Sequence, residues 1–212
     1  MPRVFSFCGH TGGVSQSDLF GAAPLPELPP GMRYAPEFLS RAQESDLLAI
    51  LRQLPLAPMQ YLQYTARRRV ASYGGQYDFS AQKLQEAQPL PAWLDPLRER
   101  AGAWAGTAPE RFTQALVAEY QPGTPLGWHR DVPDFEDVVG ISLLDEAVLR
   151  LRPWPHVVGS KAPGFKLVLP PRSIYLLRGA SRWEWQHSVP PTKALRYSIT
   201  LRTPSDRRKR KA

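Results

Sequence analysis

A histidine and an aspartate stand two residues apart in the segment YQPGTPLGWHRD, which runs from Tyr120 to Asp131. Side chains at positions i and i+2 of an extended chain project from the same face. His129 and Asp131 can therefore offer an imidazole nitrogen and a carboxylate oxygen to one metal ion. Such a pair is common by chance, so a surface contact between the two side chains is the alternative, and a third ligand decides between them.

The third ligand must come from one of the other three histidines, which are His10, His156 and His187. His10 lies in an N-terminal stretch without periodicity, and its neighbour Cys8 has no second cysteine with which to form a zinc site. His156 follows a proline in a predicted turn, where a surface histidine is expected. His187 lies on the apolar segment WEWQHSV, a predicted strand, and is the preferred candidate, with a buried packing histidine as the alternative. Two histidines and one carboxylate form the ligand set of non-haem iron oxygenases.

The segment RYSITLR is predicted to be a strand with two chemically different faces, because side chains alternate along a strand. If the polar face is exposed, it is a solvated surface. If it lines a pocket, its two guanidiniums need an anion, since an unpaired buried charge is costly. A chelating dicarboxylate, held by a metal at one end and by arginine at the other, meets that need. The polar residues are Arg196, Ser198, Thr200 and Arg202, and the apolar residues are Tyr197, Ile199 and Leu201.

Together, the segments YQPGTPLGWHRD, WQHS and RYSITLR resemble the signature of the AlkB family of iron(II)- and 2-oxoglutarate-dependent dioxygenases. That signature is His-x-Asp, a distal His, and Arg-x-Asn-x-x-x-Arg, and the similarity extends from about residue 67 to residue 202. The resemblance implies a double-stranded β-helix, or jelly roll, that uses Fe(II), 2-oxoglutarate and O2. It also implies that His129, Asp131 and His187 are the iron ligands and form the catalytic centre.

The same resemblance implies a binding site for the co-substrate 2-oxoglutarate. Tyr120 matches a tyrosine that hydrogen-bonds the co-substrate, Arg196 matches the residue that pairs with its distal carboxylate, and Arg202 matches the residue near its iron-binding end. Two positions depart from the family pattern. Ser198 replaces a common Asn and keeps one hydrogen-bond donor, whereas Ala118 replaces a frequent Asn and cannot donate.

The segment RRRVASYGGQYDFS, residues 67–80, resembles the nucleotide-recognition lid of the family's nucleic-acid enzymes. Arginines suit phosphates, and aromatic side chains suit stacking on an extruded base. A β-hairpin around Gly74-Gly75 with a solvated arginine cluster is the alternative. The candidate substrate contacts are Arg69, Tyr73, Tyr77, Phe79 and Trp128.

One position argues against a nucleic-acid substrate. In family members that repair bases, an acidic residue often lies two positions after the metal-binding aspartate and contacts the base. Here that position is Pro133, and the nearby Asp134 and Glu136 are out of register.

The elements that position these residues are mainly strands. Ser40 and Gln43 predict a capping box at the start of a helix that ends before Pro55, and a second helix is predicted from Pro91 to Trp104. Many short strands after a helical start predict an α+β, mainly β fold, a jelly roll with flanking N-terminal helices. The predicted strands are Ala115–Tyr120, Val138–Leu144, Val148–Arg152, Phe165–Leu169, Ser173–Leu177, Trp185–Val189 and Arg196–Arg202.

The chain length and the distribution of charge indicate how the chain is divided into segments. The chain has 212 residues and a net charge of +8, half of which lies in the tail DRRKRKA. A basic balance permits a nucleic-acid partner without establishing one. We expect an extended arm over residues 1–30, a dioxygenase domain over 31–204 with a substrate lid at 67–80, and a basic tail over 205–212. A single cysteine and no long apolar run or signal sequence indicate a cytoplasmic protein without a membrane partner.

The sequence therefore predicts an iron(II)- and 2-oxoglutarate-dependent dioxygenase that demethylates alkylated bases in DNA or RNA, with nucleic acid as its partner and a monomer as the default state. Two alternatives stay open. One is the same chemistry on a protein or small molecule, and the other is a non-catalytic basic jelly-roll binding module.

Overall fold

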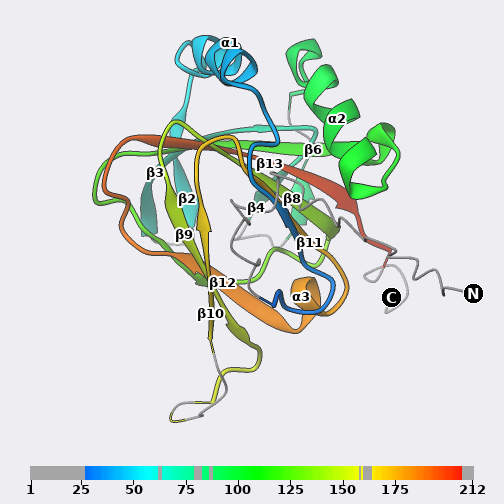
Figure 1. Ribbon diagram of the computed structural model, residues 1–212, viewed down its shortest axis with the longest axis vertical. Coiled ribbons are helices and arrows are strands. Elements are labelled where there is room, and N and C mark those ends of the chain that lie inside the picture. The colour runs from blue at the N-terminus through cyan, green and yellow to red at the C-terminus, as the bar shows by residue number, and fades with distance from the viewer. Residues whose placement is uncertain are drawn as a thin grey trace, which may run out of the picture.

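The computed structural model describes residues 27–61, 64–78, 83–85, 88–157, 159 and 164–206 of the chain. Over these residues the fold consists mainly of antiparallel strands in two facing sheets, with two helices on one side (Figure 1). The fold class predicted from the sequence is confirmed. Most of the predicted arm, including Cys8 and His10, lies outside the described residues, as does most of the basic tail.

The larger sheet supplies the cationic wall of the space between the sheets. Strand β13 (Arg196–Pro204) lies at its centre and pairs with its neighbours on both sides over almost its whole length. Tyr197, Ile199 and Leu201 point toward the helices and belong to the hydrophobic core. The polar residues of RYSITLR therefore point into the interior between the sheets. The strand order is β1 (Arg33–Ala35), β11 (Ile174–Leu177), β8 (Phe135–Leu143), β13, β6 (Gln114–Tyr120), β3 (Tyr64–Tyr73) and β2 (Ala57–Tyr61).

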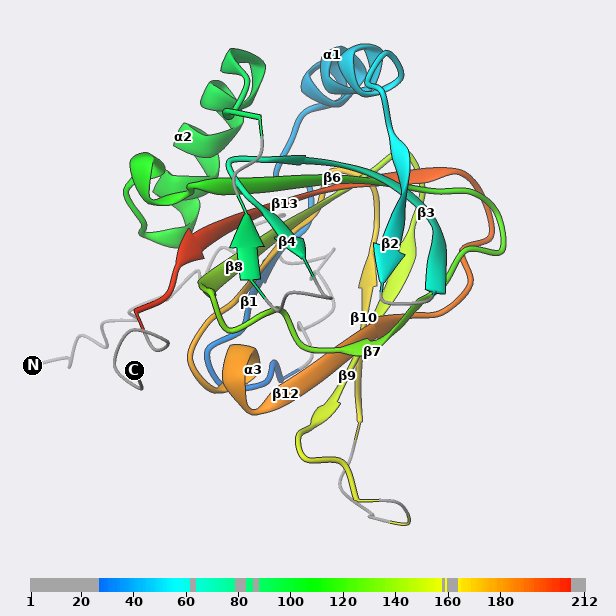
Figure 2. The same ribbon diagram turned by 180° about the vertical axis from the view of Figure 1, so that it is seen from behind.

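The smaller sheet supplies the opposite wall. Its order is β10 (Phe165–Leu169), β9 (Ala147–Pro153), β12 (Trp185–Val189) and β7 (Leu126–His129), so β7 is an edge strand (Figure 2). A second hydrophobic core lies between the sheets, and some of its side chains also line the polar cavity described below. It contains Leu149 and Leu151 from β9, Leu167 and Leu169 from β10, and Val189 from β12.

Two helices cover the outer face of the larger sheet, on the side away from β9, β10 and β12 (Figure 1). Helix α1 (Arg41–Leu51) begins at Ser40, whose hydroxyl accepts from the backbone of Gln43 while the Gln43 side chain accepts from the backbone of Ser40. The predicted capping box is thus confirmed. Helix α2 (Asp95–Ala105) follows a short 3-10 turn, Ala92–Leu94, and no described helix is long and apolar enough to cross a membrane.

The strands predicted from the sequence are all present, with ends that differ by up to three residues. The hairpin around Gly74-Gly75, the alternative from the sequence, is not formed among the described residues, because β3 and β4 pair with other strands. Strand β3 pairs with β6 and β2, and β4 (Gln76–Asp78) pairs with β5 (Lys83–Gln85). Gly74 directly follows the last residue of β3. A side chain does not fit at this position, because its Cβ would collide with the carbonyl oxygen of Thr113.

Gly140 and Tyr175 are a cross-strand pair in which one residue makes room for the other. A Cβ at Gly140 would lie 2.2 Å from the Tyr175 ring. We expect Gly140→Ala to lower the free energy of unfolding by about 1–3 kcal/mol, the usual cost of overpacking a core. Thermal or urea denaturation measures it, with Gly164→Ala as control, since a Cβ there meets only Leu151 O at 3.4 Å. Equal stability of the two variants would contradict this close packing.

Candidate metal centre and co-substrate pocket

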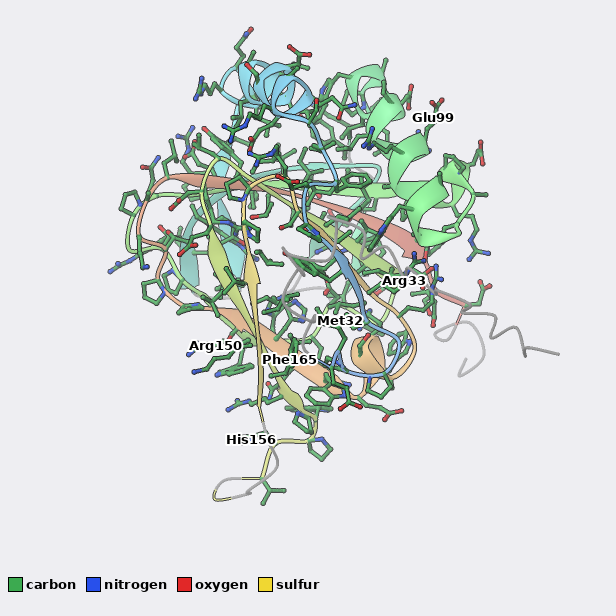
Figure 3. The ribbon with its side chains drawn as sticks, viewed as in Figure 1. Met32, Arg33, Glu99, Arg150, His156 and Phe165 are labelled. Atoms are coloured by element: carbon green, nitrogen blue, oxygen red, sulfur yellow. The ribbon has the colours of Figure 1, made fainter. Side chains whose placement is uncertain are left out.

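Three side chains converge at the end of β7 and the middle of β12. The potential ligand atoms of His129, Asp131 and His187 all lie within 4.8 Å of one another. His129 and His187 are directly opposite in the β7–β12 pairing, with ring centroids 4.2 Å apart, and Asp131 follows two residues after His129. The predicted third ligand is therefore in place, and the other histidine that the structure describes, His156, is an exposed residue beyond the end of β9 (Figure 3).

Both histidines are held in the form that binds a metal. His129 Nδ1 lies 2.9 Å from the carbonyl oxygen of Gly127, so it carries the proton and leaves Nε2 with its lone pair. Burial lowers the pKa of His129 below its ordinary value and lowers the pKa of His187 to about 3. A neutral imidazole is the ligand form, so neither ring has to lose a proton at neutral pH before it binds an ion.

The Asp131 carboxylate is oriented by an arginine from the other sheet. Arg202 reaches Asp131 Oδ1 with Nε at 2.9 Å and Nη2 at 2.8 Å, while Oδ2 lies 3.7 Å from His187 Nε2. Arg202 is itself fixed by a 2.8 Å bond from Nη1 to Gln114 Oε1. Burial alone would raise the pKa of Asp131, but Arg202 and the neighbouring cationic groups hold it well below the usual range. The side chain is therefore an anion with one oxygen directed at the histidines.

A second arginine, which sequence reasoning missed, fixes the backbone around Asp131. Arg182 lies in the short helix α3 (Ala180–Trp183) and is buried. Its Nη2 donates to the carbonyl oxygens of Asp131 at 3.1 Å, Val132 at 2.7 Å and Phe135 at 2.9 Å. Two carbonyls from the loop after β7 and one from the start of β8 thus share one guanidinium, which ties this segment to α3. The sequence carries no obvious signal for this role.

One cavity joins the three ligands to the cationic face of β13. Arg196 lies on its wall, is 3% exposed, and donates from Nη2 to Ser142 Oγ at 3.0 Å. Its Nε has no hydrogen-bond partner, and no carboxylate of the described residues lies within 4.0 Å of its guanidinium. A buried guanidinium with an unused donor needs an anion in the cavity.

Two tyrosines flank that guanidinium. The Arg196 guanidinium carbon lies 4.9 Å from the centre of the Tyr120 ring, and Tyr175 lines the same cavity. Burial raises the pKa of Tyr175, so its hydroxyl stays protonated and can donate to an anion. Tyr120 was predicted from the sequence. Tyr175 was missed, although an inward tyrosine on a strand opposite a glycine is the signal that could have indicated it.

The donor set fits an iron(II) site, and the cationic end of the cavity fits a dicarboxylate with its far carboxylate on Arg196. A family model for the 2OG-Fe(II) oxygenase superfamily matches residues 31–202, a span that contains every one of these residues. The chain belongs to this superfamily. It is an enzyme of the dioxygenase type, and the family implies Fe(II), 2-oxoglutarate and O2 as its cofactor and co-substrates.

Similar proteins place this oxygenase among the AlkB-like members. It is 28% identical over 185 residues to "Alkylated DNA repair protein ALKBH8 homolog" of Arabidopsis thaliana, a match that covers 77% of this chain and 52% of that protein. It is 33% identical over 113 residues to "Probable RNA/DNA demethylase ALKBH6" of Danio rerio, covering 53% and 46% of the two chains. The chain spans from about a quarter to about half of the length of the first curated relatives.

The solved structure of OsALKBH1 has the same fold. It superposes with a TM-score of 0.67 at 18% identity, covering 85% of this chain and 100% of that one. At this identity the likeness concerns the fold alone, which is the jelly roll that the sequence predicted.

The structure does not bring the predicted substrate contacts together at the pocket. Arg69 points to the helix side of β3, where its Nη1 lies 3.1 Å from Glu119 and its Nε and Nη2 donate to the carbonyl of Leu56. Tyr73 is 7% exposed and packs edge-to-face on Trp93 in the core. Trp128 points away from the cavity. Phe79 and the side chain of Tyr77 lie outside the described residues.

A different residue of the predicted lid reaches the cavity. Arg68, next to Arg69 on β3, lines the pocket with Ala118 and Ser198, the two departures from the family pattern. Strand alternation explains the shift of one residue, because neighbours on β3 point to opposite faces. Of the acidic residues near Pro133, Glu136 on β8 accepts from Trp183 Nε1 and Ser205 Oγ, both at 2.9 Å, so its carboxylate joins α3 to the segment after β13.

Loss of the Arg182 contacts should loosen Asp131 and weaken metal binding. We expect Arg182→Lys, which cannot reach three carbonyls with one planar group, to lower Mn(II) affinity about tenfold, a usual cost for outer groups of a metal site. Calorimetric titration with Mn(II) measures this. Arg172→Lys is the matched control, since Arg172 pairs with Glu44 on α1. Unchanged Mn(II) affinity in Arg182→Lys would show that the loop keeps its place without Arg182.

Arg196→Met should separate co-substrate binding from stability. We expect the 2-oxoglutarate concentration for half-maximal turnover to rise at least about tenfold, because a charge-assisted pair is lost. Thermal stability without ligand should be unchanged or higher, because an unpaired buried charge is removed. Succinate release against 2-oxoglutarate concentration tests the first point and a thermal melt the second. An unchanged 2-oxoglutarate requirement would mean that Arg196 binds some other group.

Proposed function

We propose that this AlkB-like oxygenase oxidatively demethylates alkylated nucleobases in DNA or RNA. The observation that carries the proposal is Arg68, a guanidinium on the wall of the same cavity as His129, Asp131 and His187. A guanidinium there suits the phosphates and base edges of a nucleic acid. The names of similar proteins, a DNA repair homolog and a probable RNA/DNA demethylase, support the same substrate class.

The residues of the chain divide the work between metal and co-substrate. His129, His187 and Asp131 Oδ2 would hold iron(II), Arg202 orients Asp131 through Oδ1, and Arg196 would pair with the distal carboxylate of 2-oxoglutarate. When bound, iron(II) and 2-oxoglutarate supply the oxidation, in which one oxygen atom of O2 enters succinate as CO2 leaves and the other enters a C–H bond.

Apolar side chains line the rest of the cavity and keep water from the reacting groups. They are Leu116, Leu126, Val138, Leu149, Leu169 and Val189. A methyl group bound to a ring nitrogen would enter this apolar part and be hydroxylated. The C–N bond of the resulting hydroxymethyl group then breaks: its electron pair returns to the ring nitrogen, the hydroxyl proton is released, and the carbon leaves as formaldehyde.

The same chemistry on a protein or small molecule is the second candidate. Tyr73 favours it, because a tyrosine packed in the core against Trp93 cannot stack on a base. A panel of methylated oligonucleotides distinguishes the two candidates.

The test supplies iron(II), 2-oxoglutarate and single-stranded oligonucleotides that carry 1-methyladenine or 3-methylcytosine, with the unmodified oligonucleotides as control. We expect formaldehyde and succinate in equal amounts from the methylated strands alone. His129→Ala and Asp131→Ala should abolish both products, because each removes a metal ligand. Succinate without base-dependent formaldehyde would reject nucleobase demethylation, and substantial turnover in either variant would reject the assigned metal site.

A further inference from the structure

The outer surface of the smaller sheet is cationic and has no part in the pocket. We call it the outer basic face and define it by the residues of β7, β9, β10 and β12 that point away from the larger sheet. Their inward neighbours, such as His129, Leu149 and His187, line the cavity. None of the outward residues is acidic. They are Trp128, Val148, Arg150, Arg152, Lys166, Val168, Gln186 and Ser188.

Two arginines on this face are held in fixed positions. The guanidinium carbons of Arg150 and Arg152 lie 5.2 and 4.1 Å from the centre of the Trp128 ring. Arg150 Nε donates to Ser188 Oγ at 3.1 Å, and Arg152 Nε lies 2.7 Å from the Gln186 side-chain oxygen when that amide is oriented to accept. All of these partners are neutral. The stacking and hydrogen bonds therefore orient the guanidiniums and leave their charge in place.

The cationic side chains of the outer basic face lie close enough to repel one another, which destabilises the sheet. Arg150 and Lys166 are directly opposite in the pairing of β9 and β10, where like charges destabilise a sheet. Among the residues that the structure describes, no carboxylate lies within 4.0 Å of either side chain or of Arg152. Figure 3 shows Arg150 at the side of the molecule, projecting from the smaller sheet. An external anion would offset this repulsion.

Apolar groups gather at the same place. The exposed large hydrophobic side chains of the described residues are Trp128, Val168, Trp154 and Val157, with 36 to 65% of their surface accessible. Trp128 and Val168 lie on the outer basic face, and Trp154 and Val157 follow the end of β9. Arg130 lies over the Trp154 ring at 4.7 Å and continues the cationic surface beside β7. Arginine combined with aromatic and apolar surface is the composition of surfaces that bind nucleic acid strands.

We propose that the outer basic face binds the sugar–phosphate backbone of a single-stranded nucleic acid. Uncompensated cations on adjacent strands complement closely spaced phosphates, and the pattern favours a polyanion over a protein partner of mixed charge. Strand β7 carries Trp128 on the outer face and His129 in the cavity, so only the edge of one strand separates the two sites. A single strand is flexible enough to pass around that edge, whereas a duplex is stiff over this length.

The face thus deepens the proposed function, since it would hold nucleotides that flank the base in the pocket. Only the link between the outer basic face and the pocket rests on the proposed demethylase function. Binding to the face needs no turnover, so the two proposals can fail separately.

The test measures binding of a fluorescein-labelled, unmodified 15-nucleotide single strand to the full chain by anisotropy at several salt concentrations. Arg150→Gln/Arg152→Gln removes two cations from the face. We expect its Kd to rise at least tenfold and the slope of log Kd against log salt to fall by about 1.4, the value for two phosphate contacts on a single strand. Lys166→Gln, which disturbs no stacked pair, should raise Kd about two- to threefold.

The control is Arg41→Gln/Arg111→Gln, which removes the same charge from exposed positions at α1 and after α2. Its Kd should stay within twofold of wild type. Equal weakening in the two double variants would overturn the proposal in favour of net charge alone. No binding by the wild type, or displacement of the strand by a polyglutamate peptide at lower concentration than by unlabelled strand, would also overturn it. If the Arg150/Arg152 variant weakens strand binding but the protein demethylates no base, the binding role of the outer basic face stands and the proposed demethylation is rejected.

Discussion

The ion pair between Arg202 and Asp131 joins the two sheets at the point where the chemistry must occur. Arg202 belongs to the central strand of the larger sheet, and Asp131 follows the edge strand of the smaller one. Both side chains are largely buried, so neither tolerates loss of the other. Because Arg202 uses one carboxylate oxygen, the second is left for a metal. The same ion pair therefore helps to fix both the position of one sheet relative to the other and the orientation of the Asp131 carboxylate.

Three arginines at this site, Arg202 of the pair and two buried neighbours, show how differently the protein compensates a cation. Arg202 has a carboxylate, Arg182 has three backbone carbonyls, and Arg196 has one serine hydroxyl and an unused Nε. The first two arginines donate to acceptors that hold Asp131 and its backbone in position, although Nε of Arg182 has no hydrogen-bond partner among the described residues. Arg196 differs from Arg182 because it lines the cavity, where its charge is open to an anion such as the co-substrate carboxylate that we expect there. Burial of an uncompensated charge before the ligand arrives is a cost that binding relieves.

Sequence reasoning was most successful where the information was local. The capping box at Ser40, the strands with alternating side chains and the His129–Asp131 pair all depend on neighbours along the chain. The set of potential metal ligands followed from two motifs taken together with a family resemblance, whereas the role of Arg196 stays a prediction. The three ligands meet because β12 pairs with β7, a strand far from it in the sequence, while β13 lies in the facing sheet.

Predictions that depended on strand pairing and on the direction of a side chain were less successful. Arg69 was selected from a run of three arginines, yet the strand directs Arg68 to the cavity and Arg69 to Glu119. Tyr73 looked suited to stacking but packs in the core. Arg182 was missed because its partners are backbone carbonyls about fifty residues away. Every residue type has such a carbonyl, so the sequence does not indicate the contact.

Strand β7 contains an irregularity that constrains the length of its sequence. His187 pairs with His129 and Val189 with Leu126, so two residues of β7, Gly127 and Trp128, stand opposite the single residue between them on β12. This bulge changes the phase of the strand, and it is the reason that Leu126 and His129 can both face inward. Deletion of one residue here would turn either the imidazole outward or the indole inward. The spacing between Leu126 and Asp131 is therefore as essential to the metal site as the identities of its ligands.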